Sequence, residues 1–397
     1  MLPDIPSPPT GEEVPPETST APPRSLRELI DRVSGRHLRD VQQGESGIAD
    51  VQPFPFLALV GQPGMKLALL LALINPALGG VLLVGPRGTG KTTAVRSLVD
   101  LMPDVPRSLC YYGCLPEDVE SGGMDAVCPE CARKYGQGEP LAVMDKVRLI
   151  ELPLNTRLED VVGSVDERAA ASDHFRIRRG LLSQADRNLL YVDEVNLLPD
   201  NIIDAILDAS AQEYYTVRRG PIAATYHSRF VLIGSMNPEE GQLRPQIMDR
   251  FGLRLIVRGL SEREERLEAY RRVKAYKINP RGTVAQFQYE TELAREEIQI
   301  ARAILPQVKL PDHVAQSGLN LVENLQIASL RAEITMFEAA RAYTAADGRT
   351  EVSPDDLRQV APMALRLRRS AFMNQYFASQ KDEESQIETI LAKVIDD

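Results

Sequence analysis

A glycine-rich octapeptide carries the clearest chemistry in this chain, because the segment 85–92 (GPRGTGKT) satisfies the pattern G-x-x-x-x-G-K-[ST]. Glycines let backbone N–H groups turn toward nucleotide phosphates, and the start of the following helix adds positive potential. In this pattern Lys91 reaches the β- and γ-phosphates, and the Thr92 hydroxyl is a ligand of Mg²⁺. The pattern predicts ATP and Mg²⁺ as cofactors, with the nucleotide held by Gly85, Pro86, Arg87, Gly88, Thr89, Gly90, Lys91, Thr92 and Thr93.

Two further polar groups follow apolar runs of strand length. The run 189–192 ends in Asp193 and Glu194, and ligands of open α/β sheets bind at the carboxyl ends of the strands. Asp193 is predicted to hold Mg²⁺ through water, and Glu194 to polarise the water that attacks ATP. The run 230–233 leads to Asn237, whose amide can bond the γ-phosphate or that water. Each motif has a plainer alternative. The glycine-rich string could be a chance match in a strand-to-helix turn, Asp193 and Glu194 could lie in a surface turn, and Asn237 before a proline could mark only a turn.

All four cysteines of the chain lie between positions 110 and 131, in the spacing C-x3-C-x13-C-x2-C. In a cytosolic protein such grouping favours a metal site over disulfides, and a tetrahedral Zn²⁺ ion would close this loop. The C-x3-C arm is looser than the usual C-x2-C pair, so free or redox-responsive thiols and an iron–sulfur cluster stay open as alternatives. The candidate ligands are Cys110, Cys114, Cys128 and Cys131; His174 is interpreted as a surface residue.

The elements that position these groups alternate between strand and helix patterns, which predicts a parallel sheet with helices on both faces. Strands are predicted at 81–84, 188–192, 230–233 and 253–257, and helices at 62–74 and 91–101. From 259 onward only helical patterns occur. Ser261 and Glu264 fit a capping box for a helix over 261–277. Further helices are predicted at 290–305, 311–327, 330–346 and 354–369.

Composition bounds the remaining possibilities. The first 25 residues carry eight prolines and almost nothing apolar, which predicts a disordered tail, followed by a short helix over 25–40. We therefore divide the chain into a tail (1–50), an α/β nucleotide-binding domain (51–258) and a helical domain (259–397). No apolar run is long enough to span a bilayer and the N-terminus is not a secretion signal, so a cytoplasmic protein is expected.

A net charge of −10 and the lack of a long basic stretch argue against nucleic-acid binding. The short cluster Arg366, Arg368 and Arg369 could contact phosphates, but we interpret it as a solvated helix face or a contact to acidic neighbours.

From about Phe54 to Arg369 the sequence resembles the ATPase I subunit of magnesium chelatase, the AAA+ motor of chlorophyll and bacteriochlorophyll biosynthesis. The segments that carry the resemblance are FPFLALVGQ at 54–62, GGVLLVGPRGTGKTT at 79–93, LYVDEVNLL at 190–198, MNPEEGQLRPQIMDRFGL at 236–253 and SLRAEITMFEAARA at 329–342. The phosphate-binding string is common to many proteins, whereas the third and fourth segments are far more specific. The proline-rich tail and the cysteine set depart from the commonest pattern of this family.

The resemblance implies an AAA+ P-loop NTPase with a C-terminal all-α lid domain. It implies a helix-2 insert at 165–180 and a hairpin over 213–229 with its bend at Gly220-Pro221. It also implies catalytic roles for Lys91, Asp193, Glu194, Asn237 (sensor 1), Arg250 (arginine finger) and Arg331 (sensor 2), with Arg244 as a second candidate for the finger. From the residues alone, Arg250 or Arg331 could equally form an ion pair at the edge of the core.

The function implied by the resemblance is mechanical. ATP hydrolysis in a homo-oligomeric, hexameric ring acts through a D-type AAA+/integrin-like subunit on a large porphyrin-binding subunit, where Mg²⁺ enters protoporphyrin IX. One alternative is a MoxR-like or cobaltochelatase-type remodelling ATPase. A neighbouring gene for the large porphyrin-binding subunit would distinguish the chelatase subunit from this alternative. A helicase-like nucleic-acid translocase is the other, and the net negative charge argues against it.

Overall fold

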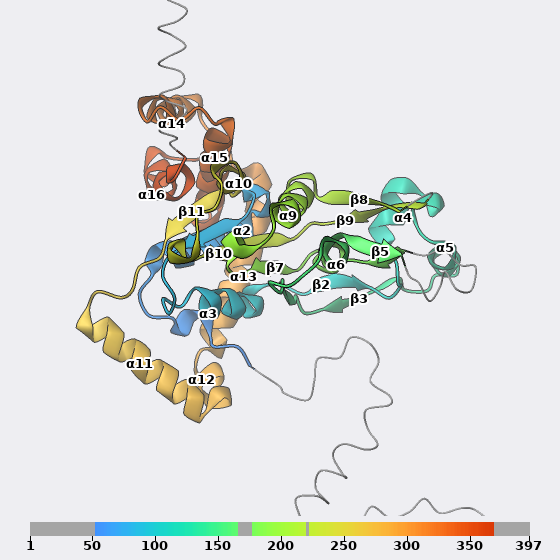
Figure 1. Cartoon of the computed structure of the whole chain (residues 1–397), viewed down its shortest axis with the longest axis horizontal. Coiled ribbons are helices and arrows are strands. Elements are labelled where there is room, and N and C mark those ends of the chain that lie inside the picture. Colours follow the sequence, from blue (N-terminus) through green and yellow to red (C-terminus); the bar gives the residue numbers. More distant parts are fainter. Residues whose placement is uncertain (1–51, 166–176, 220–221, 369–397) are drawn as a thin grey trace, which may run out of the picture. The chain divides into compact units, whose positions relative to one another are not determined.

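The computed structural model describes residues 52–165, 177–219 and 222–368. Its centre is a five-stranded, fully parallel sheet with the strand order β11-β1-β10-β7-β4 (Figure 1). The strands are β1 (Val81–Val84), β4 (Leu149–Glu151), β7 (Leu189–Val192), β10 (Val231–Met236) and β11 (Leu253–Ile256). All four predicted strands are confirmed. β4 was not predicted, because three residues with a charged end give no clear strand pattern.

Strands β1, β7 and β10 are buried along their whole length, as expected for a parallel sheet covered on both faces. Alternate side chains enter two separate apolar clusters. Val81 and Leu83 belong to one cluster, and Leu82 and Val84 belong to the other. Each face of the sheet therefore has its own core, which fixes the strands and the loops at their ends.

Helices cover both faces of this sheet, as the sequence predicts. The first core is completed by α2 (Pro63–Ile74), α3 (Lys91–Arg96) and α13 (Gln288–Ile304). The second is completed by α6 (Leu158–Val162), α8 (Leu181–Gln184), α9 (Asp200–Gln212) and α10 (Pro245–Arg250). The helix predicted over 91–101 changes after Arg96 into the 3-10 helix η3 (Ser97–Leu101).

Three antiparallel strand pairs lie outside the central sheet, and none of their strands belongs to it. They pair β2 (Val105–Ser108) with β3 (Ala142–Asp145), β5 (Gly163–Val165) with β6 (Ile177–Arg179), and β8 (Tyr214–Arg219) with β9 (Ile222–His227). The β8–β9 pair confirms the hairpin predicted over 213–229, although its bend at 220–221 lies outside the described residues. The predicted insert is described only at its ends, and residues 166–176, including His174, lie outside as well.

The cysteines lie in the connection between β2 and β3, which we call the cysteine module (residues 109–141). It contains α4 (Pro116–Gly122) and α5 (Pro129–Gly136). Its small apolar cluster is separate from both cores of the sheet and is made largely of the cysteines and of Val119, Val127 and Leu141.

After β11 the described chain is helical, apart from one isolated bridge between Lys309 and Glu351. The helices are α11 (Arg263–Ile278), α12 (Pro280–Gln286), α13, α14 (Asp312–Asn324), α15 (Leu330–Ala346) and α16 (Pro354–Leu365). The predicted capping box is wrong: the N-cap of α11 is Glu262, and the Ser261 hydroxyl donates to the Glu262 carboxylate at 3.3 Å. No helix in the described ranges is long and apolar enough to cross a membrane.

Candidate functional site: the carboxyl edge of the sheet

Three predicted segments meet where β1, β10 and β7 end, because these strands are neighbours in the sheet and run parallel. They are the glycine-rich loop after β1, the residues after β7 and Asn237 after β10. Together they surround a cavity of about 490 Å³. Its lining consists of Arg87, Gly88, Thr89, Gly90, Lys91, Thr92, Thr93, Asp193, Glu194, Ser235, Met236 and Asn237. The structure thus brings together most of the site residues that the sequence predicts.

The glycine-rich loop adopts a conformation that depends on its glycines. Gly90, the residue before α3, has φ +85°, in the left-handed region that favours glycine. At Gly85 a Cβ atom would lie 2.1 Å from the carbonyl oxygen of Val257, so only glycine allows the loop this close to the end of β11. The loop is therefore held in place by its neighbours before any ligand contacts it.

Lys91, the first residue of α3, is buried and bends back over the loop. Its ammonium group donates hydrogen bonds to the carbonyl oxygens of Gly85 at 2.7 Å and Pro86 at 2.8 Å. Burial lowers the pKa of Lys91, and the nearby Asp193 carboxylate partly opposes this shift. An ammonium group at the base of a glycine-rich loop is suited to neutralise phosphate oxygens.

Thr92 and Asp193 place two oxygen ligands side by side, since the Thr92 hydroxyl donates to the Asp193 carboxylate at 3.3 Å. Two residues that sequence reasoning missed hold this carboxylate. The Tyr191 hydroxyl donates to Asp193 Oδ1 at 2.8 Å, and Ser235 Oγ donates to the same oxygen. Hydroxyl and carboxylate oxygens are the ligands that Mg²⁺ prefers, so the donor set fits the predicted ion. Polar atoms within two otherwise apolar strands were the available signal for Tyr191 and Ser235.

Glu194 has φ +53°, a strained conformation for a residue with a side chain. Its backbone N–H donates to Ser235 Oγ at 3.3 Å. Its carboxylate pairs with Arg87 at 3.0 Å, and Arg87 also pairs with Glu240 at 2.5 Å. Glu240 and then Glu194 raise the pKa of Arg87. The Arg87 side chain is 71% exposed, so this cation bridges two acids at the edge of the cavity.

Asn237 is buried at the end of β10, and its amide N–H donates to the Glu240 carboxylate at 3.2 Å. The carbonyl oxygen of its side chain accepts from the backbone N–H of Glu239 at 3.3 Å. Two neighbouring side-chain oxygens, Glu240 Oε2 and Asn196 Oδ1, are buried and have no hydrogen-bond partner among the described residues. The amide donor of Asn237 is therefore oriented and lines the cavity, with unused acceptors beside it.

A second cavity of about 500 Å³ adjoins the glycine-rich loop, because Gly88, Thr89, Gly90 and Thr93 line both cavities. Its other walls are mainly apolar and come from the segment 54–65, from 259–260 and from α11. An apolar cavity beside a phosphate-binding loop suits the base of a nucleotide. Sequence reasoning did not predict it, although the segment FPFLALVGQ forms one of its walls. The lining residues outside the loop include Phe54, Ala58, Leu59, Met65, Leu260 and Val273.

The three predicted arginines do not line the 490 Å³ cavity. Arg250 pairs with Asp204 at 3.2 Å and Asp208 at 2.8 Å on α9. Arg244 pairs with Asp200, and Arg331, which is 57% exposed, lies 3.9 Å from Asp249. None of the three therefore lines this site within one chain.

The interpretation of the cluster at 366–369 as a solvated helix face is wrong for Arg368, and the alternative of an acidic contact is right. The helix α16 ends at Leu365, and the buried Arg368 guanidinium pairs with Asp249 at 2.7 Å. Arg254, also buried, pairs with the same carboxylate at 3.1 Å. Burial and the nearby Arg368 lower the pKa of Arg254 to about 10. The two guanidinium groups connect β11 to the segment after α16, because Arg254 donates to the Leu367 carbonyl and Arg368 to the Gly252 carbonyl. Arg369 lies outside the described residues.

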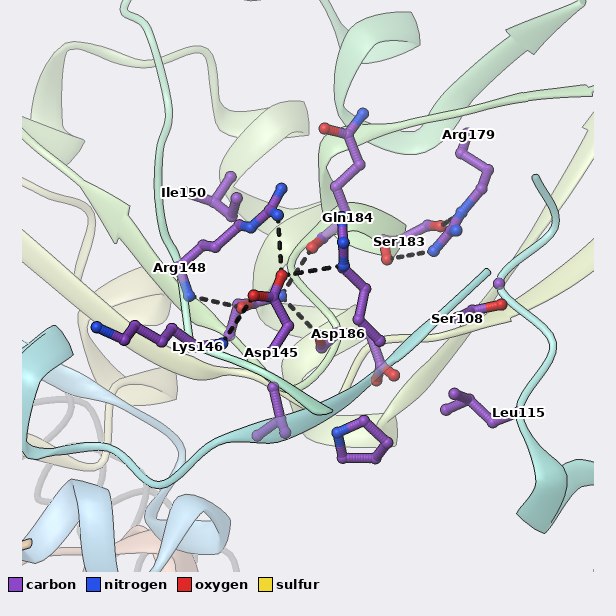
Figure 2. Close-up of a pocket in the computed structure, with 15 residues that line it drawn as sticks. Ser108, Leu115, Asp145, Lys146, Arg148, Ile150, Arg179, Ser183, Gln184 and Asp186 are labelled. Carbon is purple, nitrogen blue, oxygen red and sulfur yellow. Dashed lines mark hydrogen bonds and ion pairs between the residues drawn. The ribbon is translucent and has the colours of Figure 1, made fainter. Parts of the chain in front are cut away.

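A smaller cavity, of about 250 Å³, lies beside β2 and β3 and is lined by several charged residues (Figure 2). Asp145 pairs with Arg107 at 3.0 Å and with Arg148 at 2.9 Å. Arg179 donates to the backbone carbonyl of Ser183 at 2.8 Å. These charges find partners within the chain, and the carboxyl edge of the sheet remains the candidate site.

The cysteine prediction is confirmed in its geometry: the sulfur atoms of Cys110, Cys114, Cys128 and Cys131 all lie within 4.8 Å of one another. Cys114 and Cys131 are buried, and all four are free thiols in this structure. Whether they bind an ion stays a prediction.

Residues 163–257 match the family model "Magnesium chelatase, subunit ChlI", and residues 321–390 match "AAA lid domain". The magnesium-chelatase subunit ChlI homolog of Methanocaldococcus jannaschii is 40% identical over 80% of this chain and 87% of its own length. The magnesium-chelatase subunit ChlI of a Nostoc species is 39% identical over 79% and 84%.

A solved structure of a putative ATPase from Cytophaga hutchinsonii covers 79% of this chain and 84% of its own, with a TM-score of 0.51 at 20% sequence identity. That likeness concerns the fold alone. The family model and the two relatives, each aligned over about 80% of this chain, name the same family, and the glycine-rich loop and the parallel sheet fit it. The chain belongs to the magnesium chelatase subunit ChlI family of AAA+ ATPases.

Proposed function

We propose that this chain is the ATP-hydrolysing motor subunit of magnesium chelatase, which drives Mg²⁺ insertion into protoporphyrin IX on a separate catalytic subunit. One observation carries the proposal: Lys91, Thr92, Asp193, Glu194 and Asn237 line a single cavity at the edge of a parallel sheet. Membership of the subunit ChlI family supports the identity of the complex. The porphyrin belongs to the large subunit in this proposal, so the chain itself supplies mechanical work.

The roles of the residues follow from their chemistry. Lys91 exchanges its carbonyl partners for β- and γ-phosphate oxygens, which offer it full negative charge. Thr92 and Asp193 would hold Mg²⁺, which would neutralise phosphate charge when bound. Asn237 donates to the γ-phosphate or to the attacking water.

Glu194 orients the attacking water and accepts its proton. In this structure its carboxylate is occupied by Arg87. The ion pair must therefore open before Glu194 can act, and a phosphate near the exposed Arg87 would compete for that cation.

The predicted arginines fit a ring better than a single chain. Arg250, Arg331 and Arg244 lie outside the cavity of their own chain, so Arg250, or Arg244 in its place, would reach the nucleotide of a neighbouring subunit. Arg331 would act as sensor 2 after a movement of the lid that carries it. We propose a homo-oligomeric, hexameric ring that works with a D-type AAA+/integrin-like subunit and a large porphyrin-binding subunit.

A structural zinc ion at the four cysteines completes the proposed cofactor set, separate from the ATP site. Clustered free thiols are kept reduced in the cytoplasm, which is the proposed location.

The test is formation of Mg–protoporphyrin IX by the full chain with candidate D-type and large subunits, with ATP and Mg²⁺ present. We expect product only when all three proteins and hydrolysable ATP are present. The matched control is Glu194→Gln, which should assemble but form almost no product. ATP hydrolysis by the complex without any metal insertion would overturn the chelatase assignment and favour a remodelling ATPase of the MoxR type.

A further inference from the structure

We infer that the cysteine module (residues 109–141) binds one zinc ion through four thiolates, and that this ion anchors α4 against the base of the β8–β9 hairpin. This inference rests on the zinc ion proposed above and adds its structural role. Zinc binding can be tested without measuring ATP hydrolysis. The four sulfur atoms lie within 4.8 Å of one another. Tetrahedral ligands at about 2.3 Å from an ion stand about 3.8 Å apart, so a small contraction completes the site.

Backbone contacts already favour charged sulfur at two of the four positions. The N–H group of Cys114 donates to Cys110 Sγ at 3.3 Å, and the N–H group of Cys128 donates to Cys114 Sγ at 3.4 Å. Hydrogen bonds of this kind spread the charge that four thiolates bring to one ion. The bond from Cys128 to Cys114 also connects the two halves of the motif, so the first pair is held against the second before an ion binds.

The module has too little apolar burial to hold its loop by itself. Its buried cluster contains only five residues, two of which are Cys114 and Cys131, and it is separate from the cores of the sheet. Several large apolar side chains of the module are instead exposed, among them Leu109, Tyr111 and Met124. Small units of this kind usually depend on a metal or on disulfides. A cross-link at the cysteines meets that need.

The geometry favours a single ion over the other cross-links. The thiols are free, and disulfides would join the sulfurs only two by two, whereas all four gather around one point. An iron–sulfur cluster stands between its cysteines and holds their sulfurs further apart than one ion does. Among single ions, four thiolates in tetrahedral order are typical of structural zinc.

The consequence for the rest of the fold comes through α4, which begins two residues after Cys114. Asp118 uses one carboxylate oxygen to accept from the Leu115 N–H at 2.8 Å, which caps the helix, and pairs through the other with His227 of β9 at 3.0 Å. Glu117 accepts from Arg229 at 2.9 Å and also pairs with Arg187. Figure 1 shows α4 beside the β8–β9 hairpin.

These contacts connect the module to the hairpin and to the central sheet. Arg229 lies in the short connection between β9 and β10, and Arg187 lies just before β7. Loss of the ion should free α4 from its position, and the contacts of Glu117 and Asp118 at the base of the hairpin should weaken as a result. The catalytic groups lie at the opposite ends of β7 and β10, so basal ATP hydrolysis should persist.

The metal arm is tested by elemental analysis of the full chain purified without added metal. We expect about one zinc per chain, and few reactive thiols until a chelator is added. Cys131→Ser should lose most of the zinc, whereas Ser121→Ala, an exposed substitution in the same module, should keep it. Metal-free protein with four readily titrated thiols, a disulfide, or iron with a visible absorption band would each overturn the zinc site.

The anchoring arm is tested by backbone amide hydrogen exchange in β8 and β9, before and after chelation. We expect exchange there to rise on the order of tenfold, while strands β1 and β11 stay protected. Glu117→Gln should keep its zinc and still show faster exchange in the hairpin. Unchanged exchange in β8 and β9 after complete zinc removal would overturn the anchoring while leaving the metal site intact. Basal ATP turnover, measured in parallel, shows whether the proposed ATPase fails independently.

Discussion

Strands β7 and β10 carry charged groups at both ends, and the two ends behave differently. At the carboxyl ends, Asp193, Glu194 and Asn237 line an open cavity of about 490 Å³. At the amino ends, Arg229 is locked between two acids and pairs with Asp186 at 3.1 Å and Glu117 at 2.9 Å. The same two strands therefore present charge to a ligand at one end and neutralise charge within the chain at the other.

Residues in the left-handed region flank β7 on both sides: Arg187 with φ +63° and Glu194 with φ +53°. Such residues cost on the order of 1 kcal/mol or more each and persist where neighbours fix them. Arg187 is fixed by structural pairs to Glu117 and to the carbonyl oxygen of Arg229. Glu194 is fixed by Ser235 and by the exposed Arg87, a partner that a ligand can displace. The difference indicates that the carboxyl end is the reactive one and the amino end the supporting one.

The largest effect is expected from Arg250→Ala, which tests whether the carboxyl edge is completed by a second subunit. Such variants should bind ATP normally but hydrolyse it about 10³- to 10⁵-fold more slowly, as for other arginine fingers. Steady-state turnover and nucleotide binding measure the two effects separately. Mixing with Lys91→Ala chains should restore part of the activity, because one chain keeps the finger and the other keeps the loop. Assembled mixtures without any restored turnover would show that Arg250 does not act in trans.

Glu194→Gln separates binding from chemistry at the same edge. The amide cannot accept a proton from water, so turnover should fall about 10²- to 10⁴-fold while ATP remains bound. Retention of unhydrolysed ATP on gel filtration measures this directly. The matched variant Glu240→Gln removes the charge of the second partner of Arg87 but keeps a carbonyl oxygen that can accept from Asn237, so it should retain most of the turnover. Equal turnover by Glu194→Gln and the parent protein would refute the assigned role.

Lys91→Ala removes the buried ammonium group from the loop and should lower turnover at fixed ATP on the order of 10²- to 10³-fold. Nucleotide binding should weaken as well, in contrast to Glu194→Gln. Isothermal titration with a non-hydrolysable ATP analogue distinguishes the two variants. Unaltered affinity for the analogue would contradict the position assigned to Lys91.

Features of the fold and the site could be predicted from the sequence where the residues that form them are close together in the chain. The strands ending at Val84, Val192 and Met236 are apolar runs buried on both faces, and the groups after them were predicted because parallel strands end at one edge. Ser235 was missed because its contact to Asp193 depends on the pairing of β7 with β10. Tyr191, two residues before Asp193, was missed because it was counted only as part of the apolar run that forms β7.

The amino ends of these strands could not be predicted for a related reason. Glu117 and Arg229 are 112 residues apart in the sequence, and nothing local to either residue indicates that they meet. For Arg368 the sequence left a solvated helix face and an acidic contact open, because nothing local shows that the helix stops three residues earlier and that the guanidinium is buried beside Asp249. The apolar cavity beside the loop was missed since its walls come from three distant segments.

At the amino ends we expect effects on stability and almost none on turnover. Arg229→Met leaves Asp186 and Glu117 without this cation and should destabilise the fold by about 2–3 kcal/mol, less than for a fully buried pair because Arg229 is 29% exposed. Urea unfolding measures the change. The control Arg358→Met breaks an exposed pair with Asp355 and should cost less than about 0.5 kcal/mol. A large loss of basal turnover in folded Arg229→Met would contradict the division between the two ends.

The smallest effect is expected in the lid, where the buried Asp356 pairs with the partly exposed Arg349, remote from both ends of β7 and β10. Burial raises the pKa of Asp356, but hydrogen bonds from Arg349, Ser353 and Thr344 outweigh it and lower the pKa to about 2. Because this value lies below the ordinary 3.8, the pair stabilises the fold above about pH 4, and the contribution is lost as the pH falls toward 2. Asp356→Asn should therefore cost about 1–2 kcal/mol at pH 7 and clearly less at pH 3, measured as a difference in urea midpoint from the parent. The same difference at both pH values would show that packing, and not charge, fixes this part of the lid.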